Sequence, residues 1–168
     1  IASLIFVQRY FKQAFPVASV KMDTTKQEAQ YLAEQFLANS GHDIGDYMHA
    51  SRFGHHITAK KFLEFELPAD EAGTILNNTN SYYWRNRWFI PEQKEEYQVF
   101  ISTSGNLKYF EHQLDEDSPG DSLTHGNAQN IAEFFLVGSI GVDIENWELI
   151  DSKTEKLKNR WDHEFEWK

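Results

Sequence analysis

Apolar and polar positions follow a helical period in two separate segments of the chain, residues 25–37 and 124–136. In the first segment, apolar side chains share one face of the expected helix, at Ala29, Leu32, Ala33, Phe36 and Leu37. Thr25, followed three positions later by Glu28, predicts a capping box in which each side chain accepts a hydrogen bond from the other residue's backbone N–H group. Thr124 predicts the N-cap of the second helix.

The two helical segments open an internal repeat. Thr, Ala, Gln, Ala, Glu, Phe and Leu recur between them at a constant offset, and after one inserted residue Gly41–Tyr47 aligns with Gly141–Trp147. The same register brings Glu64-Phe65-Glu66 onto Glu164-Phe165-Glu166, and Gly138 predicts the end of the second helix. We therefore expect two copies of one supersecondary unit.

Extended patterns follow the first helix. We expect strands at residues 61–67, 81–90, 97–101 and 107–114. Residues 103–106 join the last two as a tight turn, in which Gly105 takes a positive φ. A helix followed by an antiparallel meander predicts an α+β fold in which the helix packs on one sheet face.

The pattern divides the chain into three parts. Residues 1–15 form an apolar stub, whose first seven residues read either as the end of a transmembrane helix or as an amphipathic helix docked on the domain. Residues 16–118 form the first α+β unit. Residues 119–168 form a second, truncated unit, because they contain fewer strand segments than the first.

Composition narrows the class of protein. Of the 168 residues, 40% are hydrophobic and 15% aromatic, which excludes a disordered chain. The net charge of −10 disfavours nucleic acid as a partner, because such a surface repels phosphate backbones. Cysteine is absent, which excludes disulfides, thiol catalysis and thiolate metal sites.

One aromatic and basic segment is a candidate binding surface, formed by Tyr82, Tyr83, Trp84, Arg85, Arg87 and Trp88. Interleaved rings and cations are typical of single-stranded nucleic-acid platforms. On a strand, however, Trp84 and Trp88 face one side while Arg85 and Arg87 face the other. With the acidic net charge, this favours a structural role, in which the tryptophans enter the core and the arginines contact rings or carboxylates.

The remaining candidate metal-binding and catalytic residues do not predict a functional site. His42, His49 and His55 are spaced irregularly across an expected loop, so we interpret them as solvated and predict neither a metal site nor a cofactor. Asp162 and His163, near Arg160, could belong to a hydrolytic triad, but no serine lies in a nucleophile elbow. No set of residues predicts catalysis by this segment.

The chain resembles a known type of module. A capped helix followed by aromatic strands and a glycine hairpin is similar to the PepSY-type module, which has a cystatin-like arrangement of helix on sheet. Four motifs also resemble the soluble region of some CPBP-family proteins, the CAAX-protease and bacteriocin-processing intramembrane metalloproteases. They are Tyr82-Tyr83-Trp84-Arg85-x-Arg87-Trp88, Glu95-Glu96-Tyr97-x-Val99, Phe110-Glu111-His112 and Arg160-x-Asp162-His163-x-Phe165-x-Trp167. The family's catalytic Glu-Glu pair is followed by Arg in a membrane helix, whereas Glu95-Glu96 has no such Arg and lies in a polar segment. No catalytic residue is carried over.

The resemblance implies a non-catalytic sensory, regulatory or substrate-presenting domain on the extracytoplasmic face of a bacterial membrane. Its expected partners are the membrane-embedded part of the same polypeptide, which would hold any metalloprotease activity, and a peptide or protein substrate. A first alternative is a peptide-binding or protease-inhibitory module that pairs through a sheet edge. A second is a hydrolase that uses Asp162 and His163.

Overall fold

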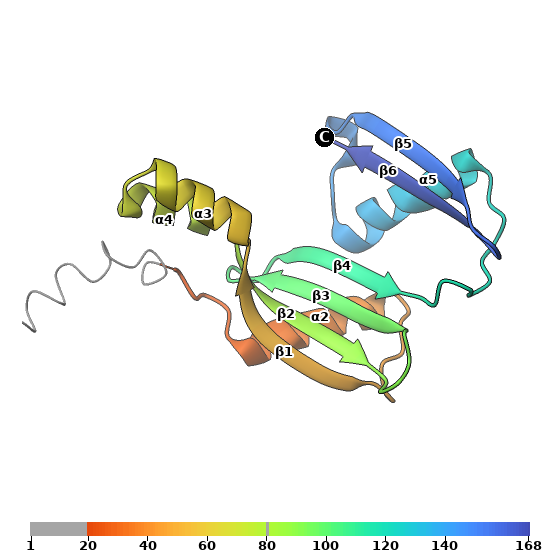
Figure 1. Cartoon of the computed structure of the whole chain (residues 1–168), viewed down its shortest axis with the longest axis horizontal. Helices are drawn as coiled ribbons and strands as arrows, with labels where there is room; N and C mark the ends of the chain where they lie inside the picture. Colours follow the sequence, from red (N-terminus) through yellow and green to blue (C-terminus); the bar gives the residue numbers. More distant parts are fainter. Residues whose placement is uncertain (1–19, 80) are drawn as a thin grey trace, which may run out of the picture.

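The computed structural model describes residues 20–79 and 81–168, which form two helix-plus-sheet units (Figure 1). The first unit contains α2 (Lys26–Asn39), β1 (Met48–His55), α3 (Ile57–Glu66), α4 (Ala69–Asn78), β2 (Tyr82–Phe89), β3 (Glu96–Ser102) and β4 (Leu107–Gln113). The second contains α5 (His125–Phe135), β5 (Leu149–Lys156) and β6 (Trp161–Trp167). Both sheets are antiparallel, so the predicted α+β class and the strands expected at 81–90, 97–101 and 107–114 are confirmed.

Both main helices begin at the predicted caps. Thr25 Oγ1 accepts a hydrogen bond from the Glu28 N–H at 3.3 Å, and Glu28 Oε2 accepts one from the Thr25 N–H at 2.8 Å. The box satisfies two backbone donors that would otherwise lack a partner at the start of α2. At α5, Thr124 Oγ1 accepts from the Asn127 N–H at 3.3 Å.

The first sheet has the strand order β1-β2-β3-β4, and α2 packs across β1, β2 and β3 on one face. Side chains alternate between the faces of a strand, so every second residue of β2 and β3 points toward α2. The buried cluster on that face contains Ala29, Ala33, Leu37, Trp88, Tyr97, Val99 and Ile101. We call the other face, which carries Tyr83, Arg85 and Arg87, the open face. In Figure 1, α2 lies behind the sheet and the open face is toward the viewer.

Two helices separate β1 from β2. The strand expected at residues 61–67 is wrong, because this segment forms most of α3. The apparent alternation at Phe62, Leu63 and Phe65 extends over too few residues to distinguish a strand from a helix. His56 caps the helix, accepting a hydrogen bond from the Ala59 N–H at 3.3 Å.

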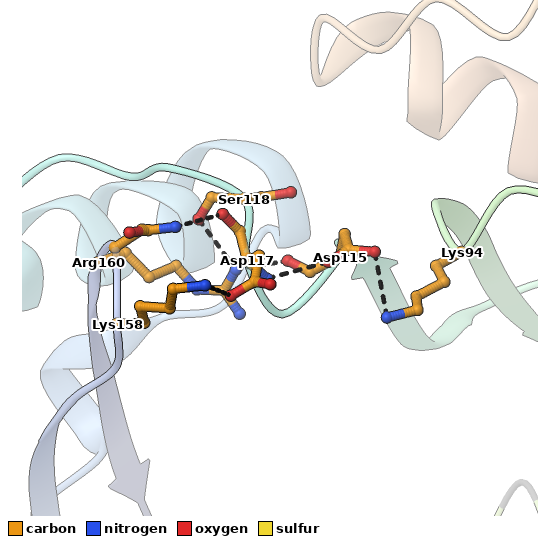
Figure 2. A network of polar contacts seen from close by, with 7 residues as sticks. Lys94, Asp115, Asp117, Ser118, Lys158 and Arg160 are labelled. Carbon is orange, nitrogen blue, oxygen red and sulfur yellow. Dashed lines mark hydrogen bonds and ion pairs between the residues drawn. The ribbon is translucent and has the colours of Figure 1, made fainter.

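The segment between β4 and α5 is anchored to both units (Figure 2). Toward the first unit, Lys94 Nζ lies 3.1 Å from Asp115 Oδ2. Toward the second, Lys158 Nζ lies 3.0 Å from Asp117 Oδ1, and Arg160 Nη1 donates to the Asp115 carbonyl at 2.9 Å. Arg160 Nη1 also lies 3.5 Å from the Ser118 carbonyl oxygen. The predicted boundary between residues 118 and 119 falls in this segment.

The strand pairing shows how the repeat continues beyond the helix. The register of the repeat places β1 on residues 148–155, and a bulge between Leu149 and Asp151 adds one residue to β5. After the bulge Phe53, which pairs with Trp84, matches Thr154, which pairs with His163. By this correspondence β5 matches β1 and β6 matches β2. The predicted match of residues 64–66 with 164–166 is therefore wrong, because the former lie in helix α3 and the latter in strand β6.

The inserted residue between the helical and glycine blocks of the repeat lies in a π-helical turn. In the first unit, the His42 N–H donates to the Leu37 carbonyl at 2.9 Å, and Gly41 has φ 81°. In the second, the Val142 N–H donates to the Leu136 carbonyl at 3.0 Å, across the π turn Leu136–Ile140, and Gly141 has φ 77°. A π-helical turn spans one residue more than an α-helical turn, so it accommodates one added residue. The predicted end of the second helix at Gly138 is therefore wrong, since Gly138 lies within the turn.

The apolar stub predicted at residues 1–15 lies outside the described residues. Among those described, no helix has both the length and the apolar character needed to cross a membrane.

Candidate functional site

The predicted aromatic and basic surface is divided between the two faces of the sheet. Tyr82 and Trp88 are each 2% exposed, and Trp84 is half-buried, with its Nε1 donating to the Thr24 carbonyl at 2.9 Å. These three rings belong to the α2 side, and two of them are buried, so they form no continuous accessible surface. β2 is also a central strand, hydrogen-bonded to β1 and β3, so it cannot accept a further strand.

The other three predicted residues lie on the open face. Arg87 binds Glu96 Oε2 through Nε, at 2.8 Å, and through Nη2, and its guanidinium lies 4.4 Å from the centre of the Phe89 ring. Arg85 lies 5.6 Å from the centre of the Phe100 ring, which stacks on Tyr83 at 4.8 Å. The structure confirms that the tryptophans and the arginines lie on opposite faces of β2. It also confirms that the arginines contact rings and a carboxylate.

A cavity of about 410 Å³ opens on this face. It is lined by Ala50, Ser51, Arg52, Arg85, Arg87 and Glu96. Arg52, on β1, lies directly opposite Arg85 in the strand register. Glu96 is committed to contacts within the sheet, because Oε1 accepts a hydrogen bond from Gln98 Nε2 at 2.7 Å while Oε2 binds Arg87.

Sequence reasoning missed Arg52 and Glu96. On the side of β1 that faces α2, Phe53 is the one large apolar side chain. The segment therefore lacks the alternation of apolar and polar residues that is typical of a strand. Glu96 belongs to the polar segment that the sequence indicates at Glu95-Glu96, but it is the first residue of β3. The one feature of the sequence that could have indicated strand β1 was the position of this segment after the first helix of the repeat.

A second cavity, of about 600 Å³, lies beside α5 and β6 and includes one side chain of the first unit, Phe110. Its walls are mainly apolar, with Leu123, Ile131, Phe135, Trp161 and Phe165 among them. Phe135 lies between the units, with ring centres 6.0 Å from Phe110 and 6.4 Å from Phe36. Within the described part of the chain, β6 is paired on one side with β5 and has no strand on its other side.

Equivalent positions of α2 and α5 are buried to different extents. Ala33 and Leu37 of the first unit are fully buried, whereas their equivalents Ala132 and Leu136 are only half-buried. The difference follows from the sheets, because α2 packs against three strands and α5 packs chiefly against β6. The apolar face of α5 is therefore partly exposed at positions whose equivalents on α2 are covered by the sheet.

The three histidines pack among rings, so their interpretation as solvated side chains is wrong; the predicted loop is also wrong for His49 and His55, whereas His42 lies in a loop. His49 and His55 lie on β1, and all three are half-buried. The His49 ring lies 4.7 Å from that of Trp88. His42 lies 5.0 Å from the Tyr97 ring, and burial, with a smaller effect of nearby His112, lowers the pKa of His42 below its ordinary value.

Asp162 and His163 make separate contacts. Asp162 Oδ1 accepts a hydrogen bond from Arg160 Nε at 2.8 Å. His163 Nδ1 lies 2.9 Å from Thr154 Oγ1, which is also 3.1 Å from His125 Nδ1. Because the carboxylate does not orient the imidazole, this geometry gives no support to a hydrolytic triad.

Among the described residues, no three or more His, Asp or Glu side chains are grouped so that they could hold a metal ion. Comparison of the chain with protein-family models, curated proteins and solved structures finds no match.

Proposed function

We propose that the chain is a peptide-binding module that captures an extended strand at β6, the sheet-edge alternative expected from the sequence. One observation carries the proposal: β6 corresponds to β2, a central strand, yet it is paired on one side alone among the described strands and borders an apolar cavity of about 600 Å³. A strand with a free edge is a template for β-augmentation, in which backbone hydrogen bonds supply affinity and pockets for alternate side chains supply specificity.

The first unit indicates which side chains such a strand would carry toward α5. On β3, Tyr97, Val99 and Ile101 point toward α2 and are 5% exposed or less. A strand beside β6 would place its alternate side chains over α5 in the same way. Bulky apolar residues at every second position would cover the half-buried Ala132 and Leu136.

The opposite face of β6 indicates the charge of the ligand. The positions of Arg85 and Arg87 on β2 correspond to Glu164 and Glu166 on β6. Arg87 is neutralised by Glu96 of the adjacent strand. The reversed charge on β6 favours Lys or Arg on the solvent side of the captured strand, because opposite charges on adjacent strands attract and like charges repel.

A peptide derived from β3 tests this proposal. The probe has the sequence of residues 94–103 with Glu96→Lys and Gln98→Lys, so that it keeps the apolar side and gains a basic side. We expect it to bind the 168-residue chain and to slow amide hydrogen exchange in residues 161–167. The unchanged peptide should bind about tenfold more weakly, since it places the Glu96 carboxylate diagonally beside Glu166.

Two controls separate strand capture from nonspecific attraction. A lysine peptide that also carries Val99→Pro should lose most of its affinity, because proline removes a backbone donor. The double variant Glu164→Lys/Glu166→Lys should prefer the unchanged peptide, whereas Glu145→Lys, an exposed charge outside β6, should not alter the preference. Equal binding of the proline peptide, or protection elsewhere than β6, would contradict the proposal.

We also propose a cellular location for the chain. The resemblance in the aromatic and basic motifs supports a domain on the extracytoplasmic face of a bacterial membrane protein, where the captured strand would belong to a substrate or regulator. Fractionation of the native protein tests this: recovery with membranes is expected, and recovery in the soluble fraction alone would contradict it.

A further inference from the structure

We propose that the cavity on the open face of the first sheet is a binding site for a phosphate monoester, held between Arg52 and Arg85. These residues lie directly opposite each other on β1 and β2, and both line the cavity of about 410 Å³. A cavity of this size is within the range of small-ligand sites. It lies in the first unit, on different strands from the β6 edge.

The two guanidinium groups lack a carboxylate partner. In the described part of the chain, neither Arg52 nor Arg85 forms an ion pair, although the protein has 26 acidic residues. Arg85 Nε is buried and has no hydrogen-bond partner among the described residues. A buried donor without a partner costs free energy, and rotation of the guanidinium group toward a ligand oxygen in the cavity would remove the cost.

Their juxtaposition is itself unfavourable without a ligand. Like charges directly opposite on adjacent antiparallel strands repel each other. Arg87 does not relieve the repulsion, because it is neutralised by Glu96, whose second oxygen is occupied by Gln98. An anion between Arg52 and Arg85 would convert the repulsion into two charge-assisted interactions.

The charge and shape of the site favour phosphate over a single carboxylate. Once Arg87 and Glu96 cancel, the lining has the two unpaired positive charges of Arg52 and Arg85. A phosphate monoester carries about two negative charges at pH 7 and offers three acceptor oxygens, enough for both guanidinium forks. A carboxylate has two oxygens and one charge, so it would satisfy one fork. The stacked Tyr83 and Phe100 rings lie next to Arg85, outside the cavity lining, and supply an apolar surface for an esterified group that extends beyond the cavity.

The test is a titration of the 168-residue chain with phenyl phosphate, followed by nitrogen–proton NMR of the arginine side chains. We expect a saturable shift of the Arg85 Nε–Hε signal, because this donor gains its acceptor on binding. Benzoate, which carries a ring and a carboxylate, should bind at least about tenfold more weakly, as expected when one charged contact is lost. Arg52→Gln and Arg85→Gln should each weaken phenyl phosphate binding by about tenfold or more.

Lys61→Gln is the matched control, because it removes an exposed positive charge on α3 and should leave the affinity unchanged. Thermal unfolding shows whether each variant folds; Arg52→Gln should be at least as stable as the parent chain, since it removes the repulsion from Arg85. The inference is overturned if the Arg85 signal does not respond, if benzoate binds as well as phenyl phosphate, or if binding survives in both arginine variants.

Discussion

Asn86, on the central strand β2, is fully buried beneath α2, where its Nδ2 lies 3.5 Å from the Ala29 carbonyl oxygen. Its Oδ1 lies 3.2 Å from His49 Nε2 on β1. One amide thus connects the helix, the central strand and the edge strand. A buried polar side chain is compatible with folding when its hydrogen-bonding groups are satisfied in this way.

Asn86→Ala should therefore destabilise the first unit by about 1–3 kcal/mol, because it leaves His49 without its partner and opens a small cavity. Urea denaturation measures the change. The matched control is Asn78→Ala on the surface of α4, which should change the free energy of unfolding by less than about 0.5 kcal/mol. Equal effects of the two substitutions would show that the Asn86 contacts do not stabilise the fold.

Trp88 and Trp147 provide a second matched comparison. Trp88 is 2% exposed and belongs to the α2 core, whereas Trp147 is 48% exposed. Trp88→Ala should cost about 3–5 kcal/mol by removing a large buried ring, and Trp147→Ala should cost much less. Chemical denaturation of both variants tests the difference, and a Trp88→Ala chain as stable as Trp147→Ala would exclude the described core.

We expect Arg160 to hold the segment between β4 and α5 in a fixed conformation. Its side chain donates to the Asp115 carbonyl at 2.9 Å (Figure 2). It also donates to Asp162 at 2.8 Å. Arg160→Gln should make residues 114–121 more susceptible to limited proteolysis, because the carbonyls lose their charged donor. Lys158→Gln removes only an exposed ion pair and should have little effect. Equal cleavage rates in the parent chain and Arg160→Gln would contradict this role.

The half-buried position of His42 predicts a pH dependence of stability. Burial, and secondarily the charge of His112, lowers its pKa in the folded chain below the ordinary 6.5, so the unfolded chain binds more protons between the two values. The free energy of unfolding should therefore fall as the pH drops below about 6.5, and this contribution should level off below the folded-state pKa. His42→Phe keeps a ring against Tyr97 and Phe110 and removes the titration. The parent chain should thus lose stability relative to His42→Phe on acidification, and parallel curves would contradict the assignment.

Short-range signals in the chain predicted a large part of the fold. The capping box of Thr25 and Glu28 depends on residues three positions apart, and the turn at Gly105, with φ 86°, depends on one residue's conformational freedom. The alternation in residues 81–90 placed Trp88 and Arg87 on opposite faces correctly, because that separation follows from the two-residue period of a strand.

The amino-acid sequence by itself determined the helix starts, the glycine turn and the two faces of β2, because these depend on interactions between residues close together along the chain. Only the tertiary structure decided that residues 57–66 are helical, that Arg52 lies opposite Arg85, and that β6 pairs on one side alone among the described strands. Each of these depends on which distant strands pair and in what register. That choice is made by burial and hydrogen bonding summed over the whole sheet, and no short stretch of sequence contains it.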